Sequence, residues 1–175
     1  MKPWMSQIEI DTILKYLKPE FTMLEWGCGG STTFFPNYVA NYYSIEHNKE
    51  WYDKISKDVP NNVTMNFVAR NSEVLGNKRA VSYGELEGSG RSKDFYDYIH
   101  YPSKLNETFD AVLIDGRGRP ECGKFITNYI TKDSIVFVHD YFYKNHRTYY
   151  HVLEEKYKVI DSIKTGQTLA VLQLK

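Results

Sequence analysis

Residues 23–32 read "MLEWGCGGST": an apolar run ends at Glu25-Trp26, and three glycines then fall within four positions. So many small residues directly after a predicted strand indicate one of two things. Either the chain makes a tight structural turn, or a ligand lies against bare backbone. The rest of the sequence has to decide between these two interpretations.

Composition and charge narrow the class of protein. The chain has 175 residues, which fits a single domain, and 22 basic side chains balance 22 acidic ones. A net charge of zero gives no reason to expect a nucleic-acid partner or a charged membrane surface. Only Cys28 and Cys122 are present, so no disulfide framework is predicted. With no signal peptide and no apolar run of about 20 residues, we expect a cytoplasmic protein.

Strands and helices alternate along the chain. The apolar pattern predicts helices near residues 8–17, 31–38, 48–58, 121–129 and 146–157, with Ser6 and Asn48 as caps and Pro36 as a source of strain. It predicts seven strands, at residues 21–26, 42–47, 62–69, 109–115, 134–140, 157–163 and 168–174. The last two strands read as a closing hairpin. This order predicts an α/β fold, a Rossmann-like doubly wound and mostly parallel sheet with helices on both faces. We expect one domain over residues 1–175, with an insertion loop at about 71–104.

Polar or small residues follow every strand that should face a cleft. In a doubly wound sheet, ligands bind outside the carboxyl ends of the strands. In chain order, the residues at these ends are Glu25 and Gly27, Glu46, Asn71 with Ser72, Asp115, and His139 with Asp140. A sheet with no ligand to bind would show this pattern less consistently, so the sequence favours a site at this edge.

The first two strand ends indicate a cofactor that contains ribose. Glu46 lies 19 residues after Gly27, where an acid can accept hydrogen bonds from both ribose hydroxyls. Thr32 occupies the position of the third glycine in the dinucleotide fingerprint, which weakens a nicotinamide-cofactor interpretation. No Gly-Lys-Ser/Thr follows, so a P-loop also fits poorly. A cofactor without phosphates and with a carboxylate-bearing tail fits better.

The segments "LEWGCGGST", "SIEHNKEWY" and "FDAVLIDGRGRPEC" resemble the successive motifs of class I S-adenosylmethionine-dependent methyltransferases. The resemblance covers nearly the whole chain and includes the reversed strand at the end of that fold. Within that class, the chain most resembles small methyltransferases with "EWG-GGST" and "DGR-R--C" motifs. Some of these are similar to sugar or glycan O-methyltransferases. The resemblance implies that Glu25 and the glycine turn hold the methionine part, that Glu46 binds the ribose, and that Asn71 or Ser72 lies near the adenine. The implied cofactor-binding set is Glu25, Gly27, Cys28, Gly29, Gly30, Ser31, Thr32, Glu46, His47, Asn71, Ser72 and Asp115.

Methyl transfer to a hydroxyl also needs a way to remove its proton, because the pKa of a hydroxyl is far above 7. Asp115 and Asp140 end neighbouring predicted strands, about 5 Å apart, which suits Mg²⁺ or Mn²⁺. Metal-dependent O-methyltransferases carry acids at these two strand ends, but they usually add an Asn or Asp where this chain has Tyr141. His139 is an alternative base. Adjacent strand residues point to opposite faces, so His139 is equally open to interpretation as a core histidine.

The acceptor is the least constrained part of the prediction. Arg117 and Arg119 are candidates to orient it, and Tyr98 and Tyr101 in the aromatic end of the insertion are candidates to stack on it. A small-molecule or glycan substrate is expected, with a carbohydrate hydroxyl as the first choice. A phenolic or catechol-like acceptor, a nicotinamide-linked oxidoreductase and a binder without catalytic activity remain open alternatives.

Overall fold

The apolar runs of the sequence pair into one seven-stranded sheet with the order β3-β2-β1-β4-β5-β7-β6. The structure is a computed structural model and describes residues 1–71, 94–142 and 150–175. Strands β1 to β5 are parallel, while β7 runs antiparallel to both β5 and β6. The strands are β1 Thr22–Trp26, β2 Asn41–Glu46, β3 Val63–Phe67, β4 Phe109–Ile114, β5 Ile130–His139, β6 Tyr157–Ile163 and β7 Leu169–Leu174. The predicted fold class is confirmed, including the reversed final strand.

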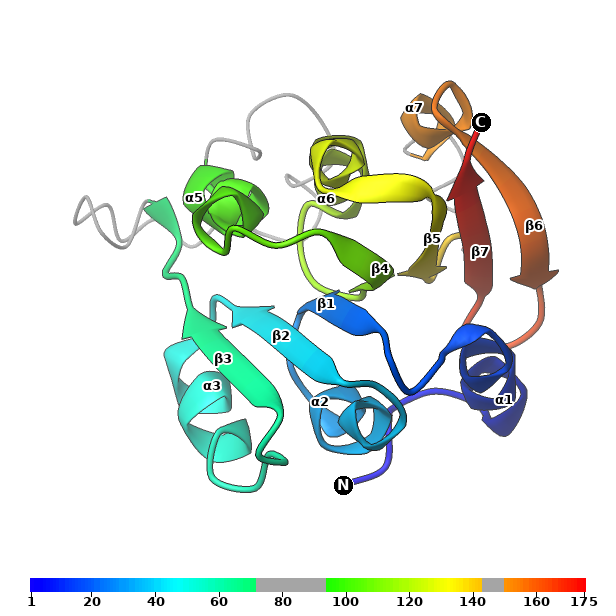
Figure 1. Cartoon of the computed structure of the whole chain (residues 1–175). Coiled ribbons are helices and arrows are strands. Elements are labelled where there is room, and N and C mark those ends of the chain that lie inside the picture. The colour runs from blue at the N-terminus through cyan, green and yellow to red at the C-terminus, as the bar shows by residue number, and fades with distance from the viewer. Residues whose placement is uncertain (72–93, 143–149) are drawn as a thin grey trace.

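Helices cover both faces of the sheet. In Figure 1, α1, α2 and α3 lie on one side, and α5, α6 and α7 lie on the other. The α-helices are α1 Gln7–Tyr16, α2 Gly30–Phe34, α3 Lys49–Ile55, α5 Tyr96–His100, α6 Arg119–Phe125 and α7 His151–Glu154. Short 3-10 turns extend three of them, at Phe35–Tyr38, Tyr101–Lys104 and Ile126–Asn128. Each face has its own apolar core, one containing Ile13 and Phe35 and the other Ile99 and Leu153.

Local sequence signals explain where these helices begin and end. The Ser6 backbone N–H and hydroxyl both donate to the Glu9 carboxylate, at 2.8 and 2.6 Å, which caps α1. The Asn48 side chain accepts from the Trp51 N–H at 2.9 Å and caps α3. The helix predicted over residues 31–38 is α-helical only to Phe34, because Pro36 has no N–H to donate and its ring crowds the preceding turn.

Two predicted segments, the insertion and the helix at 146–157, extend into residues outside the described ranges. Residues 72–93 of the predicted insertion are not described, but its end forms α5 and the 3-10 turn at Tyr101–Lys104. Of the helix predicted at 146–157, residues 143–149 lie outside the described ranges, and α7 covers only His151–Glu154.

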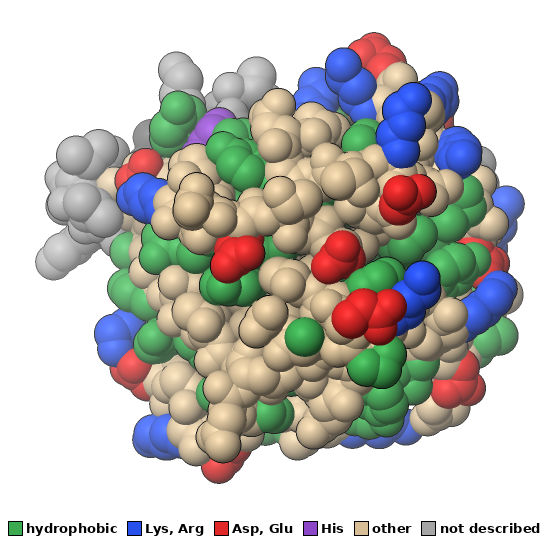
Figure 2. Space-filling model, viewed as in Figure 1, with side chains coloured by type: hydrophobic (Ala, Val, Ile, Leu, Met, Phe, Trp, Pro, Cys, Tyr) green, Lys and Arg blue, Asp and Glu red, His purple; other side chains and the backbone are tan. Residues whose placement is uncertain are grey.

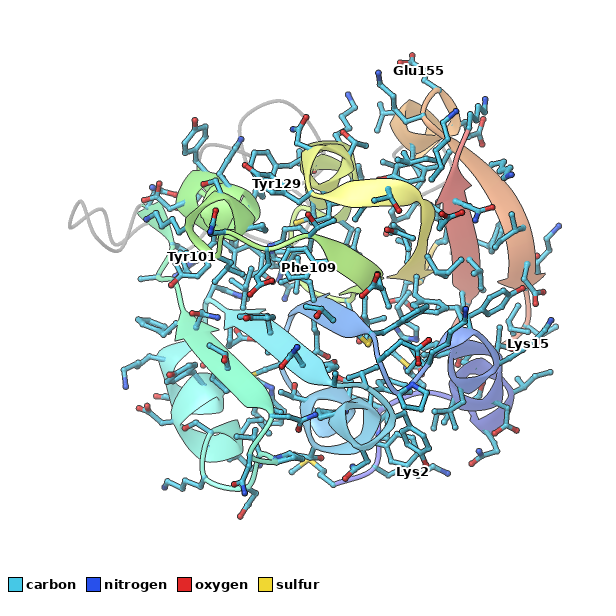
Figure 3. All side chains as sticks on the ribbon, viewed as in Figure 1. Lys2, Lys15, Tyr101, Phe109, Tyr129 and Glu155 are labelled. Carbon is cyan, nitrogen blue, oxygen red and sulfur yellow. The ribbon has the colours of Figure 1, made fainter. Side chains whose placement is uncertain are left out.

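The surface mixes charges of both signs. On the face drawn in Figure 2, acidic and basic side chains lie scattered among each other, in keeping with the net charge of zero. One such pair joins α1 to the sheet edge, where Lys15 contacts Asp161 of β6 at 3.1 Å (Figure 3). Within the described ranges, no helix has the length and apolar character needed to cross a membrane.

We predict that Gly27→Ala destabilises the fold more than Gly166→Ala. Both glycines have positive φ angles, 92° and 75°, so alanine at either costs about 1–2 kcal/mol. A Cβ at Gly27 would also lie 2.8 Å from the Gly116 Cα, whereas a Cβ at Gly166 meets nothing within 4 Å. Backbone cannot move aside cheaply, so urea denaturation should give a further loss of about 1–3 kcal/mol for Gly27→Ala. Equal losses in the two variants would contradict this packing.

Candidate functional site

The register of the parallel strands brings the predicted site residues into one row. Trp26 of β1 lies opposite Ile45 of β2 and Ile114 of β4, and Ile114 in turn lies opposite Val138 of β5. The next residue on each strand therefore reaches the same carboxyl edge of the sheet. That row consists of Glu46, Gly27, Asp115 and His139.

The glycines at residues 27, 29 and 30 serve different purposes. Gly27 packs against the backbone of Gly116, and a Cβ on Gly30 would collide with the Lys2 carbonyl, since the N-terminal segment crosses α2 there. Lys2 lies beside α1 and α2 in Figure 3. A Cβ on Gly29 would meet only ordinary contacts, the nearest being Trp51 Nε1 at 3.9 Å. The interpretation as a tight structural turn therefore holds for Gly27 and Gly30, which allow close packing of the chain, while Gly29 would accept a Cβ without a clash.

A buried carboxylate holds this turn. Glu25 has no exposed surface, and it accepts hydrogen bonds from the hydroxyls of Ser31, Thr32 and Ser44, the last two at 2.6 and 3.0 Å. Burial raises its pKa to about 7, against the opposing effect of the three hydroxyl groups. In this structure Glu25 fixes the turn and α2. The resemblance implies that Glu25 also helps to hold the methionine part of a cofactor, which stays a prediction.

Glu46 organises the end of β2. Its carboxylate accepts from three backbone N–H groups, Cys28 at 2.9 Å, His47 at 2.8 Å and Asn48 at 2.7 Å. Burial acts to raise the pKa of Glu46, but these N–H groups and the nearby His47 side chain outweigh it, and the pKa is lowered. Glu46 is thus an ionised acceptor, the state needed to bind ribose hydroxyls. Burial raises the pKa of the Cys28 thiol, which argues against a nucleophilic role.

Aromatic rings close the side of the site next to Glu46. The His47 ring meets Phe95 and Tyr98 edge-on, with ring centroids 5.1 and 5.5 Å apart. Tyr98 is fully buried and its hydroxyl faces Gly116, so it forms a wall rather than the exposed stacking surface predicted for it. The Tyr101 hydroxyl donates to Asn66 at 3.1 Å.

Of the other residues predicted for the site, the structure describes Asn71 and Arg117 but not Ser72. Asn71 bonds to the Asp97 carboxylate at 2.9 Å, which ties the end of β3 to α5. Ser72 lies outside the described residues. Arg117 is half-buried in the loop before α6, where its carbonyl accepts a hydrogen bond from the Cys122 thiol.

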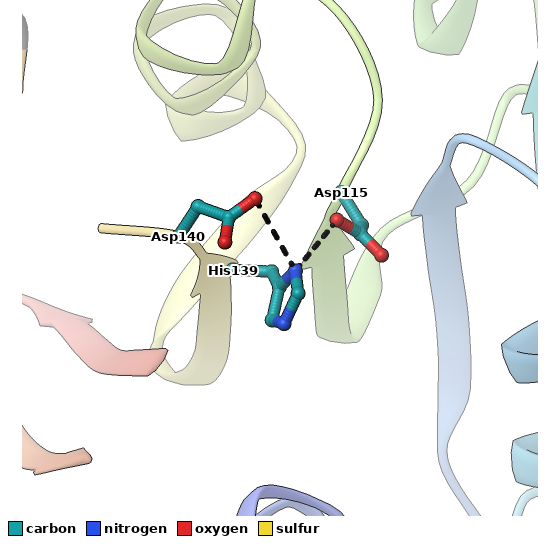
Figure 4. Close-up of side chains that lie close together, drawn as sticks. All are labelled: Asp115, His139 and Asp140. Carbon is teal, nitrogen blue, oxygen red and sulfur yellow. Dashed lines mark hydrogen bonds and ion pairs between the residues drawn. The ribbon is translucent and has the colours of Figure 1, made fainter. Parts of the chain in front are cut away.

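Asp115, His139 and Asp140 meet at the ends of β4 and β5. Their potential ligand atoms all lie within 4.8 Å of one another. His139 Nδ1 lies 2.9 Å from Asp115 Oδ1 and 3.6 Å from Asp140 Oδ2 (Figure 4). The alternation that would send His139 and Asp140 to opposite faces does not apply, because β5 ends at His139 and Asp140 adopts a φ of 58°. The chain turns there, and both side chains reach the same edge.

His139 is a buried histidine with a carboxylate at each ring nitrogen. Its side chain is only 4% exposed, and Nε2 lies 3.5 Å from Glu9 Oε1, on the opposite side from Asp115. Burial acts to lower the pKa of His139. Hydrogen bonding to Asp115 and the charges of Asp115 and Asp140 outweigh that effect, so the pKa of His139 is raised. Nδ1 is thus engaged by Asp115 and the ring is almost fully buried, an arrangement unlike that of a base open to substrate. Sequence reasoning missed Glu9, although its Ser-x-x-Glu spacing after Ser6 marks a capping residue.

Arg119 spans the two carboxylates. Nη1 lies 2.9 Å from Asp140 Oδ2, and Nη2 lies 3.3 Å from Asp115 Oδ1. The same guanidinium donates to backbone carbonyls of Asp115, Gly116 and His139. The neighbouring acids raise its pKa against the effect of burial, so it is a permanent cation. Arg119, predicted to orient the acceptor, pairs with both acids in this structure, and its contact with a substrate stays a prediction.

Several solved structures with this fold are methyltransferases or proteins similar to them. No protein-family model matches the sequence, and a search of curated protein sequences finds no match. A methyltransferase-like protein from Silicibacter pomeroyi superposes with a TM-score of 0.68 at 19% identity, over 99% of this chain and 88% of that one. Ribosomal protein L11 methylase from Lactobacillus delbrueckii gives 0.63 at 8% identity, over 97% and 78%.

A third solved structure extends this comparison to another kind of methyltransferase. Precorrin-6y C5,15-methyltransferase from Geobacter metallireducens gives a TM-score of 0.57 at 14% identity, over 100% of this chain and 92% of that one. At such identities the likeness concerns the fold alone: this chain has the Rossmann-like fold of these methyltransferases.

We predict that Glu25 makes the protein less stable as the pH rises. Its unfolded pKa is near 4.5 and its folded pKa about 7, so folding favours the protonated form. The contribution of Glu25 to the free energy of unfolding is complete below pH 4.5 and is lost as the pH rises through 7. At 1.36 kcal/mol per pKa unit, this loss is on the order of 3 kcal/mol.

Urea denaturation of the wild type and of Glu25→Gln at pH 4.5 and pH 8 measures this change. The wild type should lose stability relative to Glu25→Gln over this range. Glu20→Gln, at an exposed glutamate, is the matched control for loss of a carboxylate. A difference between the wild type and Glu25→Gln that does not vary with pH would show that the pKa of Glu25 is not raised in the folded state.

We predict that Glu9→Gln lowers the pKa of His139, because it removes the negative charge nearest to Nε2. The groups facing this ring are Glu9 from α1, Asp115, Asp140 and Arg119. NMR titration of the histidine ring protons in both proteins measures the shift. Asp11→Asn, an exposed acid on the same helix, should leave the titration unchanged. An unaltered pKa in Glu9→Gln would mean that Glu9 does not act on the imidazolium.

Proposed function

We propose that this protein is an S-adenosylmethionine-dependent O-methyltransferase that acts on a hydroxyl group of a carbohydrate or glycan. The observation that carries the proposal is the row formed by Gly27, Glu46 and Asp115 on three adjacent strands. In the sheet order observed here, this row lies at the crevice where doubly wound folds bind their ligands. The methyltransferase fold of the structural neighbours supports the same conclusion.

The residues present fit the proposed cofactor. The glycine turn would hold the amino-acid tail, as the motif resemblance implies, and the ionised Glu46 would accept hydrogen bonds from the ribose. The half-buried His47 ring, backed by Phe95 and Tyr98, is the candidate surface for the adenine. When bound, S-adenosylmethionine supplies an electrophilic methyl group. The chain has then to align the acceptor oxygen and remove its proton.

Asp140 is the best candidate to take that proton. Its side chain is 33% exposed and that of Asp115 is 26% exposed, whereas His139 is almost completely covered. A proton-accepting group must come within hydrogen-bonding distance of the hydroxyl, which favours an exposed carboxylate over a buried ring. We therefore assign His139 to positioning Asp115, and Asp140 to proton removal as the new C–O bond forms.

The choice of a carbohydrate acceptor has three supports. One is the resemblance of the motifs to small glycan methyltransferases. The second is the absence of net charge, and the third is an exposed aromatic ring on α5. Tyr96 is 55% exposed and stacks on His100 at a centroid distance of 4.0 Å. Flat exposed rings of this kind bind sugars and phenols alike. A phenolic or catechol-like small molecule is therefore the second candidate acceptor.

The sheet order disfavours the nicotinamide-linked alternative. Dinucleotide-binding sheets have the parallel order 3-2-1-4-5-6, but here the antiparallel β7 lies between β5 and β6. Thr32 also donates to Glu25 from the position where a third glycine would allow close packing. Both observations favour the methyl donor over a dinucleotide.

Calorimetric titration with S-adenosylmethionine and with its demethylated product tests the proposal. The wild type should bind both, and Glu46→Ala should bind at least about tenfold more weakly, equivalent to about 1.4 kcal/mol. Glu50→Ala, an exposed glutamate on α3, is the matched control and should bind like the wild type. If neither compound binds, the proposed function is wrong.

Turnover with labelled donor then separates the acceptor classes. Transfer to glycan hydroxyls and not to phenols supports the carbohydrate assignment, and the reverse result supports the second candidate. Cofactor binding without transfer to any acceptor class would identify a binder without catalytic activity.

A further inference from the structure

The acid cluster at the ends of β4 and β5 has the donor types of a divalent-cation site. Two carboxylates and an imidazole offer ligand atoms within 4.8 Å of one another. Mg²⁺ and Mn²⁺ prefer carboxylate oxygens and keep several waters in an open coordination shell. The question is whether these donors are available to a metal ion.

One oxygen of each carboxylate in the cluster already has a cationic or N–H partner. Asp115 Oδ1 lies 3.3 Å from Arg119 Nη2 and 2.9 Å from His139 Nδ1. Asp140 Oδ2 lies 2.9 Å from Arg119 Nη1 and 3.6 Å from the same His139 nitrogen. A metal ion on these oxygens would sit within a few ångströms of a permanent positive charge. The donor set as assembled therefore does not fit a divalent cation.

The arginine is held too firmly to swing away as a surface side chain can. It begins α6 directly after Gly118, which adopts a left-handed conformation with a φ of 60°. Its Nε donates to the Gly116 carbonyl at 3.1 Å, and its terminal nitrogens donate to the carbonyls of Asp115 and His139. The side chain is 16% exposed. Its backbone partners come from the ends of both strands that carry the acids, so releasing it would leave three carbonyls without this donor.

We propose that Arg119 is the built-in cation of this site, a positioning residue that takes the place of a divalent metal between Asp115 and Asp140. Its planar fork suits two carboxylates, and it keeps them at a fixed spacing on the acceptor side of the cofactor crevice. The role in methyl transfer rests on the proposed function. The exclusion of metal rests only on the contacts of Arg119.

Manganese titration followed by electron paramagnetic resonance tests this inference on the whole chain. The wild type should leave added Mn²⁺ free in solution, and EDTA should not change its activity. Arg119→Ala should gain a site for about one Mn²⁺ per chain, because the acids then lack their cation. Arg119→Lys, which keeps the charge, should gain none. The double variant Arg119→Ala with Asp140→Asn should lose the gained site.

Two results would overturn the inference. One is a bound Mn²⁺ in the wild type that disappears in Asp140→Asn. The other is a folded Arg119→Ala protein that binds no more Mn²⁺ than the wild type. If Arg119→Ala fails to fold, the wild-type titration and its Asp140→Asn partner still decide the matter. Cofactor binding measured on the same wild-type sample keeps a failure of the proposed function distinct from a failure of this inference.

Discussion

The buried carboxylate of Glu25 constrains the whole site. An acid in the middle of a sheet is costly to bury unless hydrogen bonds satisfy its oxygens, and here three hydroxyls from two elements do so. Ser31 and Thr32 can reach Glu25 only if the chain reverses sharply after Trp26. That reversal requires the positive φ of Gly27 and brings its backbone against Gly116. The position of Gly116 in turn fixes Asp115. One buried acid thus links the cofactor side of the site to its acid cluster.

The acid cluster shows how neighbouring charges decide what a set of residues can do. Asp115, His139 and Asp140 have the composition of a metal site, but Arg119 and Glu9 lie against them from α6 and α1. Cations between the carboxylates satisfy them as a metal would, with fixed rather than exchangeable ligands. Glu9 also caps α1. One side chain therefore both stabilises the first helix and lies against His139 of the acid cluster.

Sequence periodicity was sufficient to predict the sheet, because runs such as residues 109–115 are buried on both faces and carry a strong apolar signal. The strand-end row of Glu46, Gly27, Asp115 and His139 followed from that topology. Contacts between residues far apart in sequence could not be predicted in the same way. The pairing of Arg119 with Asp140, the approach of Lys2 to Gly30 and the burial of Tyr98 depend on how whole elements pack. Alternation also failed at the last residue of β5, where the left-handed Asp140 ends the strand and leaves two successive side chains at one edge.

The two halves of the site have different physical demands, and the chain meets them with different groups. The Glu46 end needs an ionised acceptor, and three backbone N–H groups keep its pKa low despite burial. The Asp115 end needs carboxylates that stay exposed and close together without repelling each other. Arg119 meets that need, because a guanidinium between two acids offsets their repulsion and leaves other carboxylate oxygens for an acceptor hydroxyl. Under the proposed function, the acid pair would then act on an acceptor proton without a metal ion.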